Sequence, residues 1–421
     1  MSSISEQPAR EANVNAIVSY FESGIKQQPG SIGIELEQFI TRKDLSPVTY
    51  SDNPGVEEVL SALGADYPEE VRDAEGDLLG LSRPGENITL EPSAQLELSA
   101  GPFSSLCKAQ ETFEGFEALL SEVLSKYGFI AVAQGYRPKA KANDLPRIPK
   151  QRYDFMDRYF KKIGTYGAEM MRCSAATQVS IDYFSVSDCL EKLKIAFALT
   201  PILALITDNS PSFQGAKRPH PLMRTEIWRY CDPDRCGLVT GVLDNTFTLS
   251  DYAAYILDTP AILVPDGDGW LYTEQTFGTI YADSPMSKSD VEHALSMFFN
   301  DARLKTYIEI RPADSMPIPY VLSYAALING LFYHEPNLRY LSSQFEGLTP
   351  RDVDDAKTAL MEAGYNTRIY GQTPGAIADL LLELASQGLS EGEQDFLTPL
   401  HDLITHRTTL AEIALKTGTA I

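Results

Sequence analysis

Hydrophobic and polar positions alternate strictly in the stretch "SIGIELEQFI", which runs from Ser31 to Ile40. Such alternation predicts a β-strand, in which residues two apart lie on the same face. Glu35 and Glu37 therefore share one face, opposite Ile34 and Leu36. The simplest interpretation is a strand with one solvent-facing side, as antiparallel sheets often have.

The same pattern recurs in two distant segments. Short strands and turns are predicted over Asp77–Phe103, where Gln95 and Glu97 are two residues apart and Glu91 precedes them. A further strand is predicted over Leu304–Asp314, where Glu309 and Arg311 are again two apart. Three strands thus carry acids on one face and apolar residues on the other.

Helical periodicity dominates most of the remaining chain, and strands come singly or as hairpins between long helices. This arrangement favours an α+β fold with an antiparallel sheet surrounded by helices, in a single domain over residues 1–421 whose part from about 340 to 421 is helical. Helices are predicted over 8–27, over a segment that ends at Lys126, and over Arg152–Ile163, Val186–Ile206, Tyr320–Tyr333 and the residues from Leu348 onward. Ser185 or Ser187 is the predicted cap of the helix that begins at Val186. Strands are predicted over 129–136 and 174–184, and a loop over 209–250.

Charge and composition narrow the classes of function. The 421 residues carry a formal net charge of −23 and no basic stripe, which argues against binding to nucleic acid or an anionic membrane. The longest apolar run, Ile195–Ile206, has twelve residues and contains Pro201, too few to span a bilayer. The N-terminus lacks a basic segment and an apolar segment, so a cytoplasmic protein is expected. Oligomeric state is left open.

If one sheet gathers the acids, their like charges require bound cations or shifted pKa values. Hard divalent cations prefer oxygen ligands, and Mg²⁺ is held by a few carboxylates together with substrate phosphates. Arg311 beside Glu309 would suit a phosphate oxygen. No glycine-rich phosphate-binding motif follows a strand, so a nucleotide would bind through metal and arginine. The metal interpretation therefore outweighs the solvent-facing one.

A second cluster lies in "LMRTEIWRYCDPDRCG", from Leu222 to Gly237. The cluster consists of Arg224, Trp228, Arg229 and Arg235. It is either a salt-bridged loop or a clamp for a substrate carboxylate, since a guanidinium pairs with a carboxylate through two hydrogen bonds. Cys231 and Cys236 lack the second pair that a zinc site needs; a redox disulfide is an alternative to two free thiols. The other cysteines are expected in the core: Cys107, Cys173 and Cys189. Among the histidines, His401 and His406 are expected at the surface, and an approach of His220 to the substrate loop is the less favoured interpretation.

These segments resemble, in order, the motifs of glutamate–cysteine ligases of plant and proteobacterial type, and are also similar to the actinobacterial ligase that feeds ergothioneine synthesis. The motifs are "GIELEQF", "LEPSAQLELSAGP", "MMRCSAATQVSIDY", "MRTEIWRYCDPDRCG" and "RLKTYIEIRPAD". The resemblance covers about residues 30 to 335 and continues more loosely to the C-terminus. Five motifs in order are far more specific than any one of them.

The resemblance implies a curved, glutamine-synthetase-like catalytic sheet and a Mg²⁺- and ATP-dependent ligase. ATP would phosphorylate the γ-carboxylate of L-glutamate, and the amine of L-cysteine would attack the acyl phosphate, making the first intermediate of a low-molecular-weight thiol such as glutathione. The implied metal ligands are Glu35, Glu37, Glu91, Glu97, Glu309 and Gln178. The implied substrate-binding residues are Gln95, Arg224, Trp228, Arg235 and Arg152, the catalytic ones Glu35, Glu309 and Arg311.

Two stretches depart from the plant pattern. Plant enzymes have "MMLRTCTVQVNLD" and "IWTDTDKDRTG" where this chain has "MMRCSAATQVSID" and "IWRYCDPDRCG". Both border the side where the amine would enter, so a carboxylate–amine ligase with another acceptor is the alternative. A non-catalytic glutamate- or nucleotide-binding paralogue would have lost one or more metal acids, whereas all five are present.

Overall fold

The structure is a computed structural model that describes residues 6–27, 29–267 and 269–418. Within these residues a nine-stranded antiparallel sheet forms the centre of the molecule, as the sequence predicts. The strand order is β14 (Ala302–Leu304), β15 (Ile308–Ile310), β7 (Thr177–Ile181), β1 (Ile32–Arg42), β5 (Gln95–Phe103), β4 (Glu86–Leu90), β3 (Leu78–Arg83) and β2 (Glu69–Arg72), with β6 (Phe129–Val132) also on β1.

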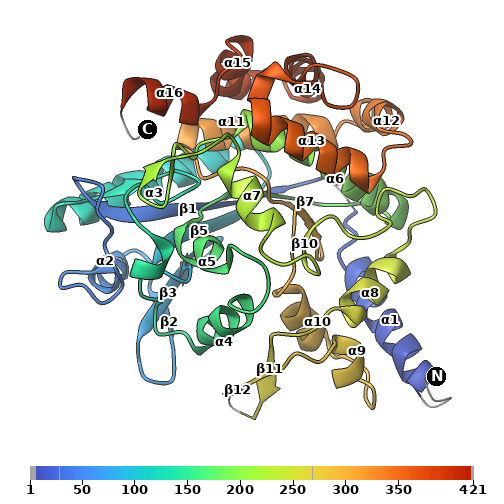
Figure 1. Cartoon of the computed structure of the whole chain (residues 1–421), viewed down its shortest axis with the longest axis horizontal. Helices are drawn as coiled ribbons and strands as arrows, with labels where there is room; N and C mark the ends of the chain where they lie inside the picture. The colour runs from blue at the N-terminus through green and yellow to red at the C-terminus, as the bar shows by residue number, and fades with distance from the viewer. Residues whose placement is uncertain (1–5, 28, 268, 419–421) are drawn as a thin grey trace.

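Helices lie on both sides of the sheet, and Figure 1 shows the C-terminal helices gathered above it and α4, α10 and the β11–β12 hairpin below. The helices before the C-terminal region are α1 (Glu6–Glu22), α2 (Val56–Leu63), α3 (Leu106–Tyr127), α4 (Gln151–Phe160), α5 (Gly167–Cys173), α6 (Val186–Ile206), α7 (Met223–Arg229), α8 (Leu249–Asp258), α9 (Phe277–Ile280) and α10 (Lys288–Leu295). The C-terminal helices are α11 (Ile318–Phe332), α12 (Glu335–Gln344), α13 (Pro350–Ala363), α14 (Pro374–Gly388), α15 (Thr398–Thr405) and α16 (Leu410–Thr417). Short paired strands complete the fold: β8 (Ser212–Phe213) with β9 (Ala216–Lys217), β10 (Cys236–Gly237) with β13 (Phe299–Asn300), and β11 (Leu263–Asp266) with β12 (Gly269–Tyr272).

The alternation along β1 divides the sheet into an apolar and an acidic face. Ile32, Ile34 and Leu36 are buried, on the side of the sheet that α3 and α11 contact. Glu35 and Glu37 consequently lie on the opposite face. The hydrophobic core thus fixes the register of β1, because a slip of one residue would place both carboxylates in the core.

Local signals place the long helices where the sequence predicts them. Ser105 caps the start of α3, because its hydroxyl accepts a hydrogen bond from the backbone N–H of Lys108. Gly128, with φ of +74°, caps the C-terminal end of the helix. Ser185, one of the two predicted caps, caps the start of α6 in the same way as Ser105 caps that of α3. Three elements are shorter than predicted: α1 ends at Glu22 rather than near residue 27, β6 stops at Val132, and β7 covers only Thr177–Ile181 of the strand predicted over 174–184.

Two segments differ more from the prediction. The stretch Leu304–Asp314 is not one strand, because the chain turns between β14 and β15 and pairs Arg303 with Glu309. The predicted loop over 209–250 contains α7 and the β8–β9 hairpin. Helix α7 packs on α5 and α13, and hydrophobic periodicity does not report such contacts with distant parts of the chain.

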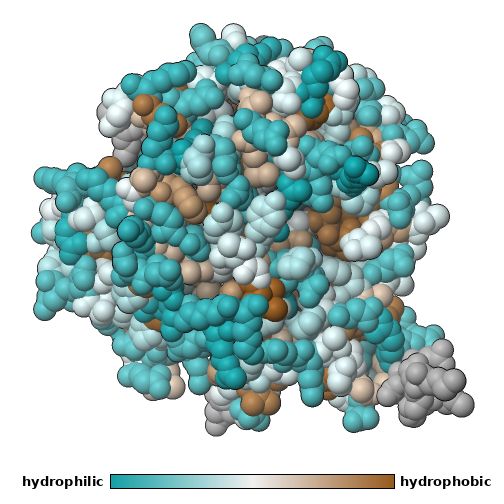
Figure 2. All heavy atoms as spheres, in the orientation of Figure 1, coloured by the Kyte–Doolittle hydropathy of each residue, from teal (hydrophilic) through white to brown (hydrophobic). Residues whose placement is uncertain are grey.

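The visible outer surface is mainly hydrophilic (Figure 2). Figure 2 shows hydrophilic residues over most of the visible face, with hydrophobic residues in small separate groups. Across the described residues, no helix combines the length and the apolar character that crossing a membrane requires.

Candidate active site

A cavity of about 950 Å³ lies over the acidic face of the sheet. Its floor comes from β1, β5 and β7, and its walls from α4, α5, α7 and the β14–β15 hairpin. Ten of the twelve residues predicted for the site line it directly: Glu35, Glu37, Glu91, Glu97, Gln95, Gln178, Arg152, Arg224, Trp228 and Arg311. An eleventh, Glu309, instead binds cations that line the cavity. The sheet therefore gathers residues that are up to 276 positions apart, from Glu35 to Arg311.

Strand register sets the spacing of the carboxylates. Glu37 on β1 is the direct cross-strand neighbour of Glu97 on β5, and Glu35 is opposite Ser99. Glu91 follows the last residue of β4, so that its side chain reaches the same cavity. Opposed residues in an antiparallel pair have Cβ atoms only about 5 Å apart. The sheet therefore brings carboxyl groups close together in a buried place.

Burial and mutual repulsion favour the protonated form of these acids. Burial, together with Glu309 and Glu97, raises the pKa of Glu35 to about 8. Burial and the nearby Glu91 raise the pKa of Glu97 to about 7, although the hydroxyls of Thr89 and Ser99 donate hydrogen bonds to it. The same causes hold the pKa of Glu37 well above its usual range. Near neutral pH this part of the cavity thus favours cations.

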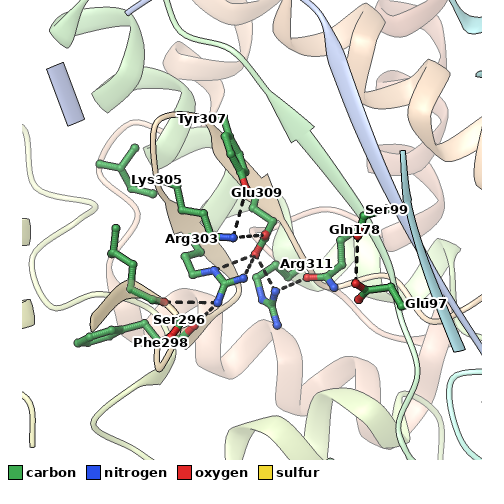
Figure 3. A network of polar contacts seen from close by, with 12 residues as sticks. Glu97, Ser99, Gln178, Ser296, Phe298, Arg303, Lys305, Tyr307, Glu309 and Arg311 are labelled. Atoms are coloured by element: carbon green, nitrogen blue, oxygen red, sulfur yellow. Dashed lines mark hydrogen bonds and ion pairs between the residues drawn. The ribbon is translucent and has the colours of Figure 1, made fainter. Parts of the chain in front are cut away.

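Glu309 has a different environment, as Figure 3 shows. Its carboxylate accepts hydrogen bonds from Arg303 Nε at 2.9 Å, from Lys305 Nζ at 3.1 Å and from Arg311 Nη1 at 2.7 Å. Burial alone would raise the pKa of Glu309, but these three cations outweigh burial and hold it well below its usual range. Glu309 therefore stays ionised and gathers positive side chains at the β14–β15 edge of the cavity.

The donors fit a hard cation, although they do not form a complete cage. Among residues 6–27, 29–267 and 269–418, no group of three or more acidic, histidine or cysteine side chains converges closely enough to hold a metal ion by itself. Mg²⁺ does not require such a cage, since it keeps several waters and binds one or two carboxylates plus phosphate oxygens. Glu97 is a charge neighbour of both Glu35 and Glu37, so these three acids are the best-placed oxygen donors.

Two glutamines are held firmly by their surroundings. The amide oxygen of Gln178 accepts a hydrogen bond from Arg311, and its nitrogen donates to Glu37 at 3.2 Å. Gln178 thus connects the acidic and basic parts of the cavity. The amide nitrogen of Gln95 donates hydrogen bonds to the backbone carbonyl oxygens of Met171 and Ser174, at 3.1 Å each.

Arginine and tryptophan side chains of α7 line a further part of the cavity wall. Arg224, on α7, donates from Nη1 to the carbonyl of Arg311 at 3.0 Å, and its guanidinium lies 5.7 Å from the ring centroid of Trp228. Within the described part of the chain, Arg224 Nε and Trp228 Nε1 are buried without a hydrogen-bond partner. Buried donors of this kind carry a free-energy cost until a ligand or water pairs with them.

Arg235 and Arg152 are placed differently from the rest. Arg235 does not line the cavity: its fully buried guanidinium pairs with Asp232 and donates to Tyr159 and to the carbonyl of Pro260. The expected substrate contact of Arg235 is thus replaced by a structural role that holds the loop after α7. Arg152 lines the cavity, where both terminal nitrogens donate to Ser296.

Several cavity residues escaped the sequence prediction. Arg303 and Lys305 belong to the strand-like run that contains Glu309, but only the hairpin turn brings them onto its carboxylate. Lys150 and Trp270 also line the cavity, as do three methionines: Met156, Met170 and Met171. Trp270 lies on β12 and stacks on His293 with a centroid distance of 4.9 Å.

The cysteines and histidines follow the predictions with one exception. Cys173 and Cys189 are buried, whereas Cys107, expected in the core, is exposed on α3 because it lies on the outer side of the first turn. All five cysteines in the described chain are free, including Cys231 and Cys236. His401 and His406 are exposed, and His220 pairs with Glu226 rather than lining the cavity.

A smaller cavity of about 290 Å³ joins the site at Glu35, which lines both. Small residues dominate this side cavity, among them Gly33, Ser99 and Ser180. Lys26 and Tyr307 stand at its border. Glu35 thus lies between two spaces, one rich in arginine and one lined by small residues.

Comparison with known proteins gives a consistent result. Residues 31–420 match the family described as glutamate-cysteine ligase family 2. A chloroplastic glutamate–cysteine ligase of Arabidopsis thaliana is 29% identical over 415 residues, covering 95% of this chain and 78% of the relative. One from Oryza sativa subsp. indica is 28% identical over 416 residues, covering 95% and 83%. The solved glutamate–cysteine ligase of Francisella tularensis in complex with AMP shares the fold, with a TM-score of 0.59, 13% identity and coverage of 93% and 85%.

Proposed function

Because the chain belongs to glutamate–cysteine ligase family 2 and is therefore a ligase, we propose that it joins the γ-carboxylate of L-glutamate to the amine of L-cysteine with hydrolysis of ATP. The products are γ-glutamylcysteine, ADP and phosphate. One observation carries the proposal: a single cavity holds a row of buried carboxyl groups on β1 and β5 and a cluster of cations around Glu309 and Arg311. The reaction brings together a divalent cation, phosphate groups and a carboxylate, which need both kinds of side chain.

Magnesium, when bound, supplies charge neutralisation at the phosphate oxygens during transfer. Glu35, Glu37 and Glu97 would hold it, since their carboxyl groups are not ion-paired to neighbouring cations in the way that Glu309 is. Glu91 is a further donor on the same face, and Gln178 contributes by orienting Glu37. Binding a metal requires these acids to lose the protons that burial favours.

The arginines are assigned to the anionic substrates. Arg311 lies between Glu309 and Gln178, next to the acidic row, and is the candidate to stabilise the transferred phosphoryl group. Within the described structure, Arg224 Nε has no hydrogen-bond partner, so the guanidinium of Arg224 can donate two hydrogen bonds to a carboxylate of glutamate. The ring of Trp228 packs against this guanidinium. Such positioning, rather than a nucleophilic side chain, is what acyl phosphate formation asks of a protein.

The two spaces beside the acids suggest how the substrates are divided. We assign the side cavity near Gly33 and Ser180 to the nucleoside of ATP, because it opens at Glu35, where the phosphates must meet the metal. Glutamate then occupies the Arg224 end. Met156, Met170 and Met171 form an apolar, polarisable wall there that suits the thiol side chain of cysteine.

The first test is ADP release by the purified protein with ATP, Mg²⁺ and L-glutamate, across cysteine, 2-aminobutyrate and alkylamines, with mass spectrometry of the products. Formation of a γ-glutamyl dipeptide that requires cysteine or its isostere supports the proposal. Turnover with a different amine only would retain the mechanism and replace cysteine as the acceptor. Absence of turnover with every amine, together with tight glutamate or nucleotide binding, would replace the enzyme with a sensor. The expected cytoplasmic location stays a prediction, since the plant relatives are named chloroplastic.

A further inference from the structure

A buried ion pair connects the C-terminal helices to the substrate-binding arginines. Lys357, on α13, pairs through Nζ with Oδ2 of Asp301, and the two side chains are 4% and 14% exposed. Asp301 lies between β13 and β14, directly behind the cavity. Its carbonyl accepts a hydrogen bond from the backbone N–H of Arg311 at 3.0 Å. Asp301 is therefore fixed to the segment that bears Arg311.

The carboxylate of Asp301 has a second set of cations within reach. A hole of about 20 Å³, which is room for a single water, is lined by Asp301, Arg224, Trp228 and Arg311 together with five other residues. Burial lowers the pKa of Arg224, and the carboxylates of Asp314, Glu37 and Asp301 lie near enough to oppose this shift. Two positive groups thus compete for this carboxylate: Lys357 from behind and Arg224 from the cavity side.

We propose that Lys357 is a positioning residue that keeps Asp301 turned away from Arg224 and so leaves the Arg224 guanidinium free for the carboxylate of the substrate. This inference rests on the proposed function, in which Arg224 binds glutamate. Removing the ammonium leaves the mostly buried carboxylate of Asp301 without its partner, and Arg224 and Arg311 line the same small hole as Asp301. A buried charge in that position pairs with whatever cation it can reach.

The expected effect is selective. Lys357→Met raises the KM for glutamate by about tenfold or more and leaves the KM for ATP within about twofold, because only the Arg224 end loses a binding group. Lys357→Arg restores the glutamate KM, since a guanidinium also satisfies Asp301. Asp301→Asn in the Lys357→Met background restores it too, because no negative charge is left to capture Arg224.

A neighbouring contact supplies the matched control. Thr358 follows Lys357 on α13 and accepts a hydrogen bond from Arg229 of α7 at 2.6 Å, so it also joins the two helices. Thr358→Val removes this contact without changing any charge near Asp301. It is expected to leave both KM values unchanged. A rise in the glutamate KM of Thr358→Val equal to that of Lys357→Met would show a general loosening of α13 and would overturn the inference.

The experiment combines initial rates of ADP release with glutamate titrations followed by tryptophan fluorescence. Both tryptophans of the chain, Trp228 and Trp270, line the cavity, so the signal reports binding without turnover. A wild type that neither binds glutamate nor releases ADP overturns the proposed function and this inference together. A wild type that does both, with an unchanged glutamate KM in Lys357→Met, overturns this inference alone. If Lys357→Met fails to fold, the double variant Lys357→Met with Asp301→Asn is measured instead. A glutamate KM equal to that of the wild type supports the inference, and a raised KM overturns it.

Discussion

The raised pKa values of the cavity acids make metal binding release protons, and the number of protons can be worked out. With pKa values of about 8 for Glu35 and about 7 for Glu97, the two groups hold about 0.9 and about 0.5 proton at pH 7. A cation that binds both as carboxylates therefore displaces about 1.4 protons at pH 7 and about 0.1 at pH 9. Glu37, whose pKa is also raised, adds to this number if it binds as well.

Isothermal titration calorimetry measures this release directly. Mg²⁺ is titrated into the protein with a non-hydrolysable ATP analogue present, in two buffers of different ionisation enthalpy at each pH. The difference in apparent enthalpy between buffers gives the protons released per metal bound. We expect a value of one to two at pH 7 that falls toward zero by pH 9. A value near zero at pH 7 would refute the argument, because it would mean that the acids are already ionised or do not bind the metal.

Two variants sharpen the measurement. Glu97→Gln is expected to lower the release at pH 7 by at least about half a proton, because it removes the group with a pKa of about 7 and also a charge that raises the pKa of Glu35. Glu117 serves as the control: burial and the nearby Glu114 raise its pKa too, but it lies on α3 and does not line the cavity. Glu117→Gln should leave the proton release unchanged.

Three further substitutions test the site. The pKa of Glu35 is raised in the folded protein, so its contribution to the free energy of unfolding is present below pH 4.5 and is lost as the pH rises to about 8, by about 5 kcal/mol at most. Glu35→Gln is therefore expected to raise the metal-free melting temperature at pH 8 but not at pH 4.5. The same variant is expected to abolish ADP release. Arg224→Lys is expected to raise mainly the KM for glutamate, since a point charge replaces a fork; an unchanged KM would remove Arg224 from the pocket. Glu309→Gln is expected to abolish ADP release with the fold intact by freeing the cations that Glu309 gathers; an active variant would remove Glu309 from the catalytic residues.

The parts of the fold that follow from local periodicity could be predicted from the sequence. The alternation in β1 fixes both its strand structure and the shared face of Glu35 and Glu37, since the apolar half must be buried. The ends of α3 and the start of α6 follow from a serine cap and a terminal glycine. These features depend on residues that are neighbours along the chain.

Features that depend on distant contacts could not be predicted in this way. Arg224 and Arg235 are eleven residues apart in the same arginine-rich segment, yet one lines the cavity and the other is fully buried against Asp232 and Tyr159. Arg224 lies on the seven-residue helix α7, and Arg235 lies in the segment that follows it. A helix so short is stabilised by packing rather than by its own sequence. Residue type alone therefore could not tell which arginine of this segment lines the cavity.

The charges of the cavity are balanced in two ways, and the difference indicates where each substrate group enters. Glu309 is balanced by Arg303, Lys305 and Arg311, so this edge stays charged on both sides. Glu35 and Glu97 are balanced largely by protons, which a metal ion can replace without breaking an ion pair. A cation therefore enters most easily along β1 and β5. An anion enters most easily beside Arg311 and Arg224, where donors are already gathered, so phosphoryl transfer is expected at the boundary between the two regions, next to Gln178.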